Sequence, residues 1–295
     1  MTRIYQAITI CCLMSISPRV LLSIDYEPVF ALFRHYDGLT DPDQRRDLDA
    51  GFTLRAVDPI LEQLGESKAS IYLVGEIAEW YPEIPQKIVS AGHELGLHCH
   101  IHRPLVDVKE LADDIRASAS WCKQYNVRGY RAPMIGISEA AYPLLEASGF
   151  LYSSSIYAPA GTLLQRGNVW EIPVSTIRFS GENGTYAAPR DFSLKLLFDG
   201  EIPYGSSFSI GLIGHRILKV IENELKRGHS PVIILHPYEL VKPVSSSRLT
   251  RDLMRNPLFV PFLRAKSAFL TELLRNFPIS PLGTYLDETL KATDS

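Results

Sequence analysis

The chain has 295 residues, of which 46% are hydrophobic and 21% charged, and its formal net charge is −3. This composition is typical of a globular protein that can bury a sizeable core. The slight negative charge argues against a nucleic-acid partner, because a protein that binds nucleic acid normally shows a basic face.

The N-terminus is ambiguous. Residues Ala7–Ile16 form a short apolar run behind Arg3, which resembles the core of a signal peptide. The run is too short to span a bilayer, which takes about 20 apolar residues. We expect residues 1–18 to be an N-terminal extension or leader-like segment, followed by one domain over residues 19–290. We expect a cytoplasmic protein without a stable membrane span, or a secreted or membrane-associated one if residues 1–18 are a leader.

Short apolar runs then alternate with longer amphipathic runs. The expected strands are Val20–Asp25, Ala69–Gly75, His93–His98, Gly129–Pro133, Leu151–Ile156, Glu171–Arg178 and Pro231–Pro237. The expected helices are Leu54–Leu64, Ile84–Ser90, Val108–Tyr125, Ser138–Gly149, His215–Lys226 and Leu258–Asn276. This alternation predicts parallel βαβ units and an α/β fold. The stretch Phe179–Gly211, rich in Gly, Ser and Pro, is expected to be a loop region over the barrel and not a second domain.

Reactive side chains recur at the carboxyl ends of these strands. Asp25, His98, Arg131 and His236 each follow or end an expected strand. Active sites of α/β barrels and of open α/β sheets lie at those ends. The coincidence predicts one site that collects all four side chains.

Two of the strand ends have the pattern of a metal site. Asp25 and Glu27 are two residues apart, so in an extended chain both carboxylates lie on one face. His98, His100 and His102 fall within five residues, and His98 and His102 can converge if the chain turns after its strand. One carboxylate and two imidazoles suit Zn²⁺, Fe²⁺ or Co²⁺ and leave positions open for water and substrate.

Each strand end also has a simpler interpretation. Acids are common in solvated loops at strand ends, and a single histidine is more often structural. Arg131 can orient a carboxylate by a bidentate bond, or it can be a surface arginine. His236 follows the apolar run VIIL and can be a core histidine.

Taken in order, four motifs resemble the polysaccharide deacetylase family with the NodB homology domain, which is carbohydrate esterase family four. SIDYE resembles the first motif in its D-x-E variant, GHELGLHCHIH the second, YRAP the third and ILHPYE the fifth. The resemblance runs from about Val20 to about Leu286. It implies a single-domain distorted (β/α) barrel, with residues 19–290 as the catalytic domain.

The resemblance also implies roles for individual residues. Asp25 would be the general base, held in position by Arg131. Glu27, His98 and His102 would bind a divalent metal. Zinc is the metal expected first, with iron, cobalt and nickel as alternatives.

The remaining roles concern the leaving group and the substrate. His236 would be the general acid that protonates the leaving amine. The backbone N–H of Met134 would help to hold the oxyanion. Tyr26 and Tyr238 are aromatic candidates for contact with a sugar ring, although aromatic side chains also dominate ordinary cores.

Two positions depart from the family pattern. Met134 stands where the family often has an aromatic residue after the proline. The stretch Leu151–Ser155 has no carboxylate where the fourth motif usually offers an aspartate that tunes the acid histidine. Either another acid such as Glu171 or Glu239 takes that role, or His236 is less finely tuned.

The sequence therefore predicts a metal-dependent hydrolase that removes an N-acetyl or other N-acyl group from a sugar of a bacterial-type cell-surface glycan or its precursor. One alternative is an amide hydrolase of the same fold that acts on a small nitrogen compound such as a ureide or imide. A second is a glycan-binding protein that has lost catalysis. A non-haem iron oxygenase fits worst, because it leaves Asp25, Arg131 and His236 without a role. The sequence predicts no oligomeric state.

Overall fold

The computed structural model of the chain describes residues 16–105, 107–178, 201–244 and 247–293. Most of the predicted N-terminal extension, residues 1–15, lies outside the described residues. No helix in the described ranges is both long enough and apolar enough to cross a membrane.

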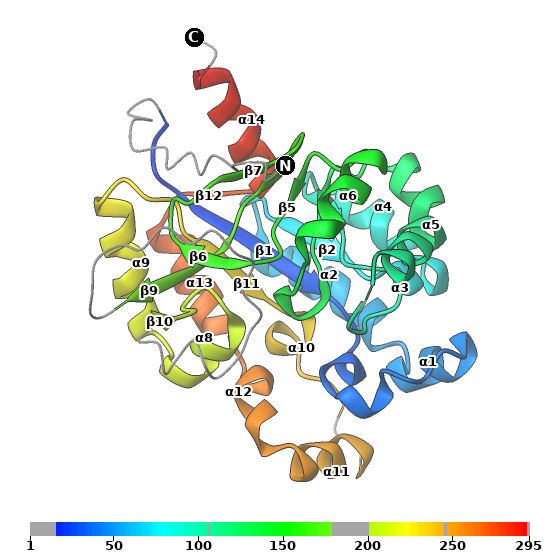
Figure 1. The fold of residues 1–295 in the computed structure, drawn as a ribbon. Helices are drawn as coiled ribbons and strands as arrows, with labels where there is room; N and C mark the ends of the chain where they lie inside the picture. The colour runs from blue at the N-terminus through cyan, green and yellow to red at the C-terminus, as the bar shows by residue number, and fades with distance from the viewer. Residues whose placement is uncertain (1–15, 106, 179–200, 245–246, 294–295) are drawn as a thin grey trace.

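A curled, mainly parallel sheet forms the centre of the molecule (Figure 1). Strand β1 (Val20–Tyr26) lies inside it, between β11 (Val232–Leu235) and β2 (Ser70–Leu73), and is parallel to both. Beyond β2 the sheet continues through β3 (Glu94–Leu97), β4 (Gly129–Tyr130), β5 (Tyr152–Ser153), β8 (Val169–Glu171) and β7 (Leu164–Arg166). Strand β12 (Ile279–Ser280) also pairs with β1. A second sheet contains β10 (Glu201–Ile202), β9 (Val174–Arg178) and β6 (Tyr157–Pro159).

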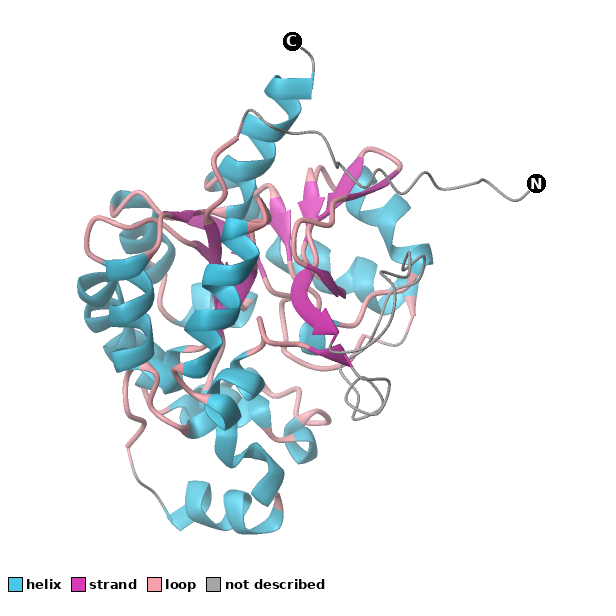
Figure 2. Ribbon diagram, turned by 90° about the vertical axis from the view of Figure 1, so that its left-hand side faces the viewer, coloured by secondary structure: helices cyan, strands magenta, loops and turns pink. Residues whose placement is uncertain are grey.

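Helices surround these strands (Figure 2). In the first half of the chain they are α1 (Pro42–Asp49), α2 (Phe52–Leu64), α3 (Gly75–Trp80), α4 (Glu83–Ser90), α5 (Val108–Gln124) and α6 (Tyr142–Ala147). In the second half they are α8 (Ser207–Ile213), α9 (Arg216–Lys226), α10 (Pro237–Leu240), α11 (Ser247–Arg255), α12 (Val260–Leu263), α13 (Ser267–Asn276) and α14 (Leu282–Thr293). Short 3₁₀ turns are η1 (Val29–Leu32), η2 (Arg34–Tyr36), η3 (Pro133–Ile135), η4 (Glu139–Ala141) and η5 (Pro257–Phe259). The α/β barrel that the sequence predicted is confirmed.

The residues of β1 alternate between two cores. Leu22 and Ile24 pack into the larger cluster, which includes the inner faces of the helices. Leu21 packs instead with Val232 and Ile234 of the neighbouring strand in the smaller cluster on the other side of the sheet. Because successive strand residues point to opposite faces, this alternation fixes which polar residues of β1 face inward.

The predicted helix Leu258–Asn276 is wrong in its first half. The chain there forms η5 and α12, and a regular helix begins only at α13. The buried amino group of Lys266 donates to the backbone carbonyls of Pro261, Phe262 and Arg264, which ends α12 before α13 starts. Helix α14 follows and was not predicted.

Two other predicted segments need correction. The expected strand Glu171–Arg178 is two strands, β8 and β9, with Pro173 between them, where it cannot donate to a ladder. Of the predicted loop Phe179–Gly211, residues 179–200 lie outside the described residues. The rest contains β10 and the start of α8, so the prediction of a loop is wrong there.

His93, just before β3, gives a pH-dependent contribution to stability. It is 6% exposed, and its Nδ1 accepts a hydrogen bond from the backbone N–H of Ala69 at 3.2 Å. Burial, with a smaller effect of Lys68, lowers the pKa of His93 from 6.5 to about 4. The unfolded chain therefore takes up a proton near pH 6.5 that the folded chain resists, and stability is lost as the pH falls below that value.

We predict that the free energy of unfolding falls by about 2 kcal/mol more in the wild type than in His93→Asn between about pH 7.5 and pH 5. Asparagine keeps an acceptor for the Ala69 N–H and does not titrate. Denaturant titration at the two pH values measures the difference. Equal losses in both proteins would contradict the assignment.

Candidate functional site

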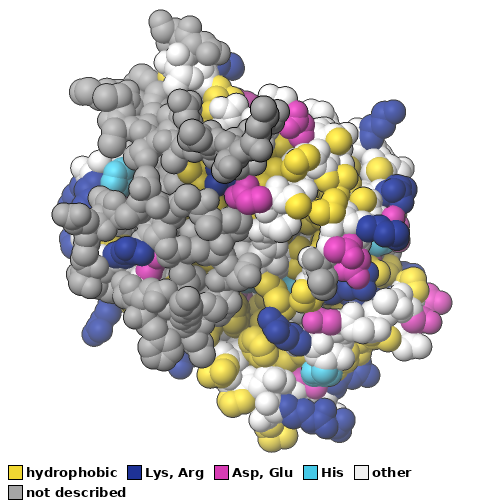
Figure 3. Space-filling view, viewed as in Figure 1, with side chains coloured by type: hydrophobic (Ala, Val, Ile, Leu, Met, Phe, Trp, Pro, Cys, Tyr) yellow, Lys and Arg dark blue, Asp and Glu magenta, His cyan; other side chains and the backbone are white. Residues whose placement is uncertain are grey.

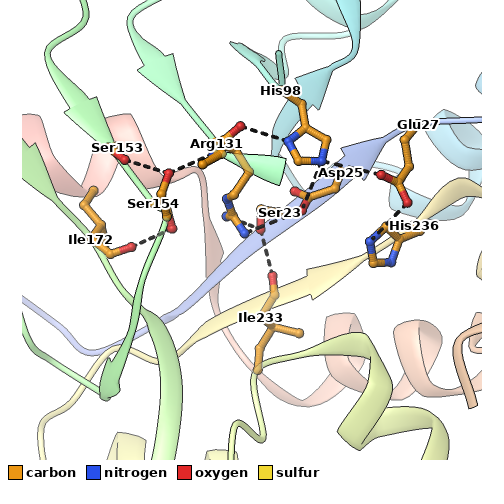
Figure 4. A network of polar contacts seen from close by, with 12 residues as sticks. Ser23, Asp25, Glu27, His98, Arg131, Ser153, Ser154, Ile172, Ile233 and His236 are labelled. Atoms are coloured by element: carbon orange, nitrogen blue, oxygen red, sulfur yellow. Dashed lines mark hydrogen bonds and ion pairs between the residues drawn. The ribbon is translucent and has the colours of Figure 1, made fainter. Parts of the chain in front are cut away.

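The end of β1 brings two carboxylates into the barrel. Asp25 lies in β1 and Glu27 directly follows it, and each is 3% exposed. Both side chains point toward His98 (Figure 4). The intervening Tyr26 packs in the larger core. The shared face predicted from their two-residue spacing is confirmed.

The chain turns immediately after β3, as the predicted metal pair requires. Cys99 adopts a φ of 79°, in the left-handed region, and thereby reverses the chain direction. The Asp114 carboxylate of α5 accepts hydrogen bonds from the backbone N–H groups of His100 at 2.6 Å and Ile101 at 3.2 Å. This loop returns His102 to the side of the barrel where His98 lies, with the two rings 5.0 Å apart.

The same turn packs closely against the start of α3. The N–H of Gly75 donates to the carbonyl of Cys99 at 2.8 Å. A Cβ at Gly75 would collide with the Ser118 hydroxyl and the His100 ring, so only glycine fits. His100 itself contacts Ser118 at 3.1 Å and is not part of the metal-binding group.

Glu27, His98 and His102 form a group that can hold a metal ion. Their ligand atoms all lie within 4.8 Å of one another, and all three residues are buried. Glu27 Oε2 lies 2.8 Å from Nε2 of His102 and 3.5 Å from Nε2 of His98. Nδ1 of His98 lies 2.9 Å from the carbonyl oxygen of Arg131, so Nδ1 must carry the proton and Nε2 of the neutral ring presents its lone pair to the group.

The residues of this group shift one another's pKa values. Burial alone would raise the pKa of Glu27, but the imidazoles of His102, His98 and His236 hold it well below its usual range. Burial would lower the pKa of His102, and the Glu27 carboxylate outweighs that effect and raises it. A cation between the buried carboxylate and the two imidazole nitrogens would offset the cost of burying the negative charge. The donor set therefore fits a divalent metal.

Arg131 lies behind Asp25, as predicted. Its Nη1 is 3.6 Å from Asp25 Oδ2, and its Nη2 donates to the hydroxyl of Ser23 at 3.1 Å. The guanidinium also lies over the ring of Tyr72 at 4.6 Å and is fully buried. Asp25 Oδ1 is buried and has no hydrogen-bond partner among the described residues, so it is available for a water or substrate proton.

His236 approaches the group from β11, on the side opposite Arg131. Its Nε2 lies 3.8 Å from Glu27 Oε1, and its Nδ1 lies 3.0 Å from Glu239 Oε1. Burial would lower the pKa of His236, but the carboxylates of Glu239, Glu27 and Asp25 raise it to about 9. Lys266 contacts the same Glu239 oxygen at 3.3 Å.

This geometry distinguishes between the two acids that the sequence left open. Glu239, three residues after His236, is the carboxylate on the histidine. Glu171 accepts instead from the backbone N–H of Ser155 at 2.6 Å and from the Tyr142 hydroxyl at 3.0 Å. The serines that replace the fourth-motif aspartate are therefore organised by Glu171 and lie apart from His236.

A pocket of about 940 Å³ opens onto these groups. Asp25, Glu27, His98, His102 and His236 all line it. Its walls are mainly apolar and come from loops and short helices: Ala31, Leu32, Pro104, Leu105, Pro133, Met134, Ile135, Ile137, Phe208, Leu258, Phe259 and Phe262. The reacting end of a substrate would thus meet polar groups, and the remainder would meet a largely apolar surface.

Of the three residues predicted to contact the substrate, two line the pocket and one does not. Met134 lines the pocket with a φ of 57°, as does Ile135 beside it, so the backbone of η3 is strained where it meets the site. Tyr238 also lines the pocket, and its hydroxyl donates to Glu27 Oε1 at 2.7 Å. The prediction for Tyr26 is wrong, because Tyr26 faces the helices and donates to the carbonyl of Thr53 at 2.6 Å.

Sequence reasoning missed the apolar lining and several polar wall residues, among them Arg34 and Tyr157. Arg34, in η2, donates to the Met134 sulfur at 3.6 Å at the rim, and Tyr157 lines the pocket from β6. Tyr157 directly follows the expected strand Leu151–Ile156, so the strand-end pattern could have found it. Arg34 lies in none of the four motifs and at no predicted strand end, and its position depends on how the loops fold over the barrel.

Tyr238 orients Glu27, so its hydroxyl should affect metal binding. We predict that Tyr238→Phe weakens zinc affinity by at least about tenfold, which is the usual effect of losing an outer hydrogen bond to a ligand. Competition with a chelator of known affinity measures it. Tyr26→Phe is the matched control, since it removes a buried tyrosine hydroxyl one residue from Glu27 that donates to the Thr53 carbonyl and not to Glu27; it should leave zinc affinity unchanged. Equal affinities of the wild type and Tyr238→Phe would contradict the role.

Comparisons with known proteins agree with this architecture. No protein-family model matches the chain. A peptidoglycan deacetylase-like protein of Gibberella zeae is 26% identical over 136 residues, which are 44% of this chain and 40% of that protein. The match therefore spans about two fifths of the length of this curated relative.

Solved structures match over much more of the chain. A protein of Mycobacterium smegmatis assigned to the polysaccharide deacetylases superposes with a TM-score of 0.53 at 18% identity, over 89% of this chain and 93% of that one. Another of the same assignment, from Pseudomonas aeruginosa, gives a TM-score of 0.49 at 14% identity over 90% and 94%. The Mycobacterium smegmatis match shows that the chain has the fold of the polysaccharide deacetylases, as the resemblance of its motifs predicted.

Proposed function

We propose that this protein is a metal-dependent hydrolase that removes an N-acyl group, foremost acetyl, from a sugar of a bacterial-type cell-surface glycan or its precursor. The observation that carries the proposal is the arrangement in one pocket of a candidate metal group with an acid–base residue on each side. The printed name of the Gibberella zeae relative, a peptidoglycan deacetylase-like protein, supports the same class of reaction. Residues 19–290 would be the catalytic domain.

Glu27, His98 and His102 would hold the metal, with zinc as the first candidate and iron, cobalt or nickel as alternatives. When bound, a divalent metal polarises the amide carbonyl and makes a water molecule more acidic. Asp25 takes the proton from the attacking water through its unpartnered Oδ1. Arg131 orients that carboxylate through the ion pair with its Oδ2.

His236 acts on the opposite side of the scissile bond. It donates a proton to the nitrogen as the C–N bond breaks, so that the sugar leaves as a neutral amine and the acyl group as a carboxylic acid. Glu239 keeps the ring oriented through Nδ1, and Nε2 faces the pocket. The backbone N–H of Met134, at the pocket wall, is the candidate donor to the oxyanion.

One observation favours a different substrate for the same chemistry. The apolar walls of the pocket offer a polar glycan chain few hydrogen-bond partners beyond Arg34, Ser138, Ser206 and Ser207. An amide hydrolase for a small or partly apolar nitrogen compound is therefore the second candidate. A glycan-binding protein without catalysis is the third, and turnover separates it from the other two.

The first test combines metal analysis with an acetate assay. Protein purified without chelator should carry about one metal ion per chain, because the group offers one set of three ligands. Acetate release is measured on N-acetylglucosamine oligomers and on isolated cell-surface glycans. Metal with acetate release supports the proposal. Metal without release from any glycan would favour the small-compound hydrolase or the binding protein, and absence of metal would overturn the metal-dependent mechanism.

Asp25→Asn should lower kcat by at least about a hundredfold while metal content stays at the wild-type level, since general base catalysis contributes about that much or more. His98→Ala is the contrasting variant and should lose metal and activity together. Elemental analysis and the acetate assay on the same preparations separate the two effects. Unchanged turnover in Asp25→Asn would remove Asp25 from the mechanism.

Glu239→Gln should lower kcat by at least about tenfold, because the amide keeps the shape of the side chain but not the charge that supports His236. KM and metal content should stay constant, since Glu239 is 1% exposed and does not line the pocket. Glu171→Gln is the matched control, as Glu171 is equally buried and bonds elsewhere. If the Glu171 variant lost kcat and the Glu239 variant did not, the assignment would be reversed.

A further inference from the structure

The segment Lys242–Arg264, of which residues 245–246 lie outside the described part, exposes many large apolar side chains. Val244 is 70% exposed, Met254 73%, Leu258 70% and Val260 43%. These are four of the nine exposed large hydrophobic residues in the described chain. Single exposed apolar residues are ordinary, but such a concentration in one short segment marks an interaction surface.

The same segment is strongly basic in a chain with a net charge of −3. Arg248, Arg251 and Arg255 are spaced three and four residues apart, so they share one exposed face of α11. None of the three forms an ion pair with any residue in the described ranges. Lys242 and Arg264 are exposed as well.

The single acid of the segment, Asp252, is four residues after Arg248 and three before Arg255, so it lies beside their face and offsets one of its three charges. Asp252 is 4% exposed and lies on the inner side of α11. It accepts a hydrogen bond from the Tyr36 hydroxyl at 2.9 Å, and His35 lies 3.3 Å from its other oxygen. Three exposed arginines against one buried carboxylate leave this side of α11 with net positive charge.

The basic and apolar surface is continuous with the active-site pocket. Leu258, Phe259 and Phe262 belong to the segment and also line the pocket. α12 packs against α8, whose Leu212 is 56% exposed. Figure 1 shows α11 and α12 at one end of the molecule, and hydrophobic and basic side chains lie side by side there in the space-filling view (Figure 3).

We propose that the described residues of this segment, 242–244 and 247–264, bind an anionic lipid surface. A short helix with arginines on one face and adjacent exposed aliphatic side chains matches the chemistry of the interface, where arginines meet lipid phosphates and aliphatic side chains enter the acyl boundary. An acidic protein or a nucleic acid would satisfy the arginines but would leave Met254, Leu258 and Val260 in water. The charge complementarity and the exposed apolar side chains together select the lipid.

The position of this surface beside the pocket also narrows the class of substrate, an inference that rests on the proposed function. A lipid surface at the pocket rim would present amphiphilic substrates, whose sugar enters the pocket while an apolar part contacts its apolar walls. An acylated amino sugar attached to a lipid chain fits both features. Polymers free in solution would gain nothing from the surface.

Sedimentation with vesicles tests the lipid site without requiring turnover. The full chain should sediment with vesicles of phosphatidylglycerol and phosphatidylcholine. Its affinity for vesicles of phosphatidylcholine alone, or for the anionic vesicles at high salt, should be lower by about tenfold or more. Arg251→Gln with Arg255→Gln should lower binding to the anionic vesicles by more than about tenfold, at about fivefold for each charge. Met254→Ser should weaken it by a smaller factor.

The matched control is Lys219→Gln with Lys226→Gln, which removes two exposed positive charges from α9. It should bind vesicles like the wild type. Failure of the wild type to sediment with anionic vesicles, or equal losses in the two double variants, would overturn the lipid site.

A second measurement addresses the substrate. The arginine double variant should hydrolyse a long-chain alkyl N-acetylglucosaminide in anionic vesicles more slowly than the wild type, and a soluble N-acetylglucosamine oligomer at the same rate. Vesicle binding without hydrolysis of either compound would contradict the deacetylase and leave the lipid site standing. Equal rates of both proteins on the vesicle substrate would refute surface-presented substrate.

Discussion

Strand β1 is hydrogen-bonded to parallel neighbours on both sides, and this constraint controls the rest of the site. Its register cannot shift by one residue without moving Leu22 and Ile24 out of the helix-lined core. Asp25 and Glu27 must therefore face inward, where an unpaired charge would cost several kcal/mol. Burial of these two acids is tolerated only because positive or hydrogen-bonding groups surround them, and the site consists largely of those groups.

The groups that surround the acids come from the ends of other strands. β3 ends before His98, β4 ends before Arg131 and β11 ends before His236. Each partner is itself held by a second contact, such as the Arg131 carbonyl on His98 or Glu239 on His236. The candidate catalytic and metal-binding residues thus lie on the strands and strand ends of the barrel. The walls that decide which substrate fits come from η1 to η3, α8 and the segment before α13, which are the parts of the fold with most freedom to vary.

The buried side chain of Lys266 connects the catalytic residues at the strand ends with the pocket walls. Lys266 contacts the Glu239 carboxylate and also donates to carbonyl groups at the end of α12. The same amino group therefore supports the partner of His236 and ends the helix that forms one pocket wall. If the described residues of Lys242–Arg264 bind lipid and His236 is the general acid, Lys266 would connect the lipid-binding surface to the carboxylate that orients that acid.

The sequence by itself determined the barrel, the inward face of Asp25 and Glu27, and the histidine pair, because each depends on local periodicity and on a turn within a few residues. It also contained the evidence that Tyr26 would point away, since a strand residue between two inward acids must face outward. The contact of Glu239 with His236 is local, between residues three apart at the start of α10, and only the tertiary structure decided that Glu171 bonds instead to Ser155 and Tyr142. It also decided the pocket walls and the break in Leu258–Asn276. The carbonyl groups that Lys266 binds are close in sequence, but its burial depends on the distant carboxylate of Glu239, and helix periodicity does not encode that contact.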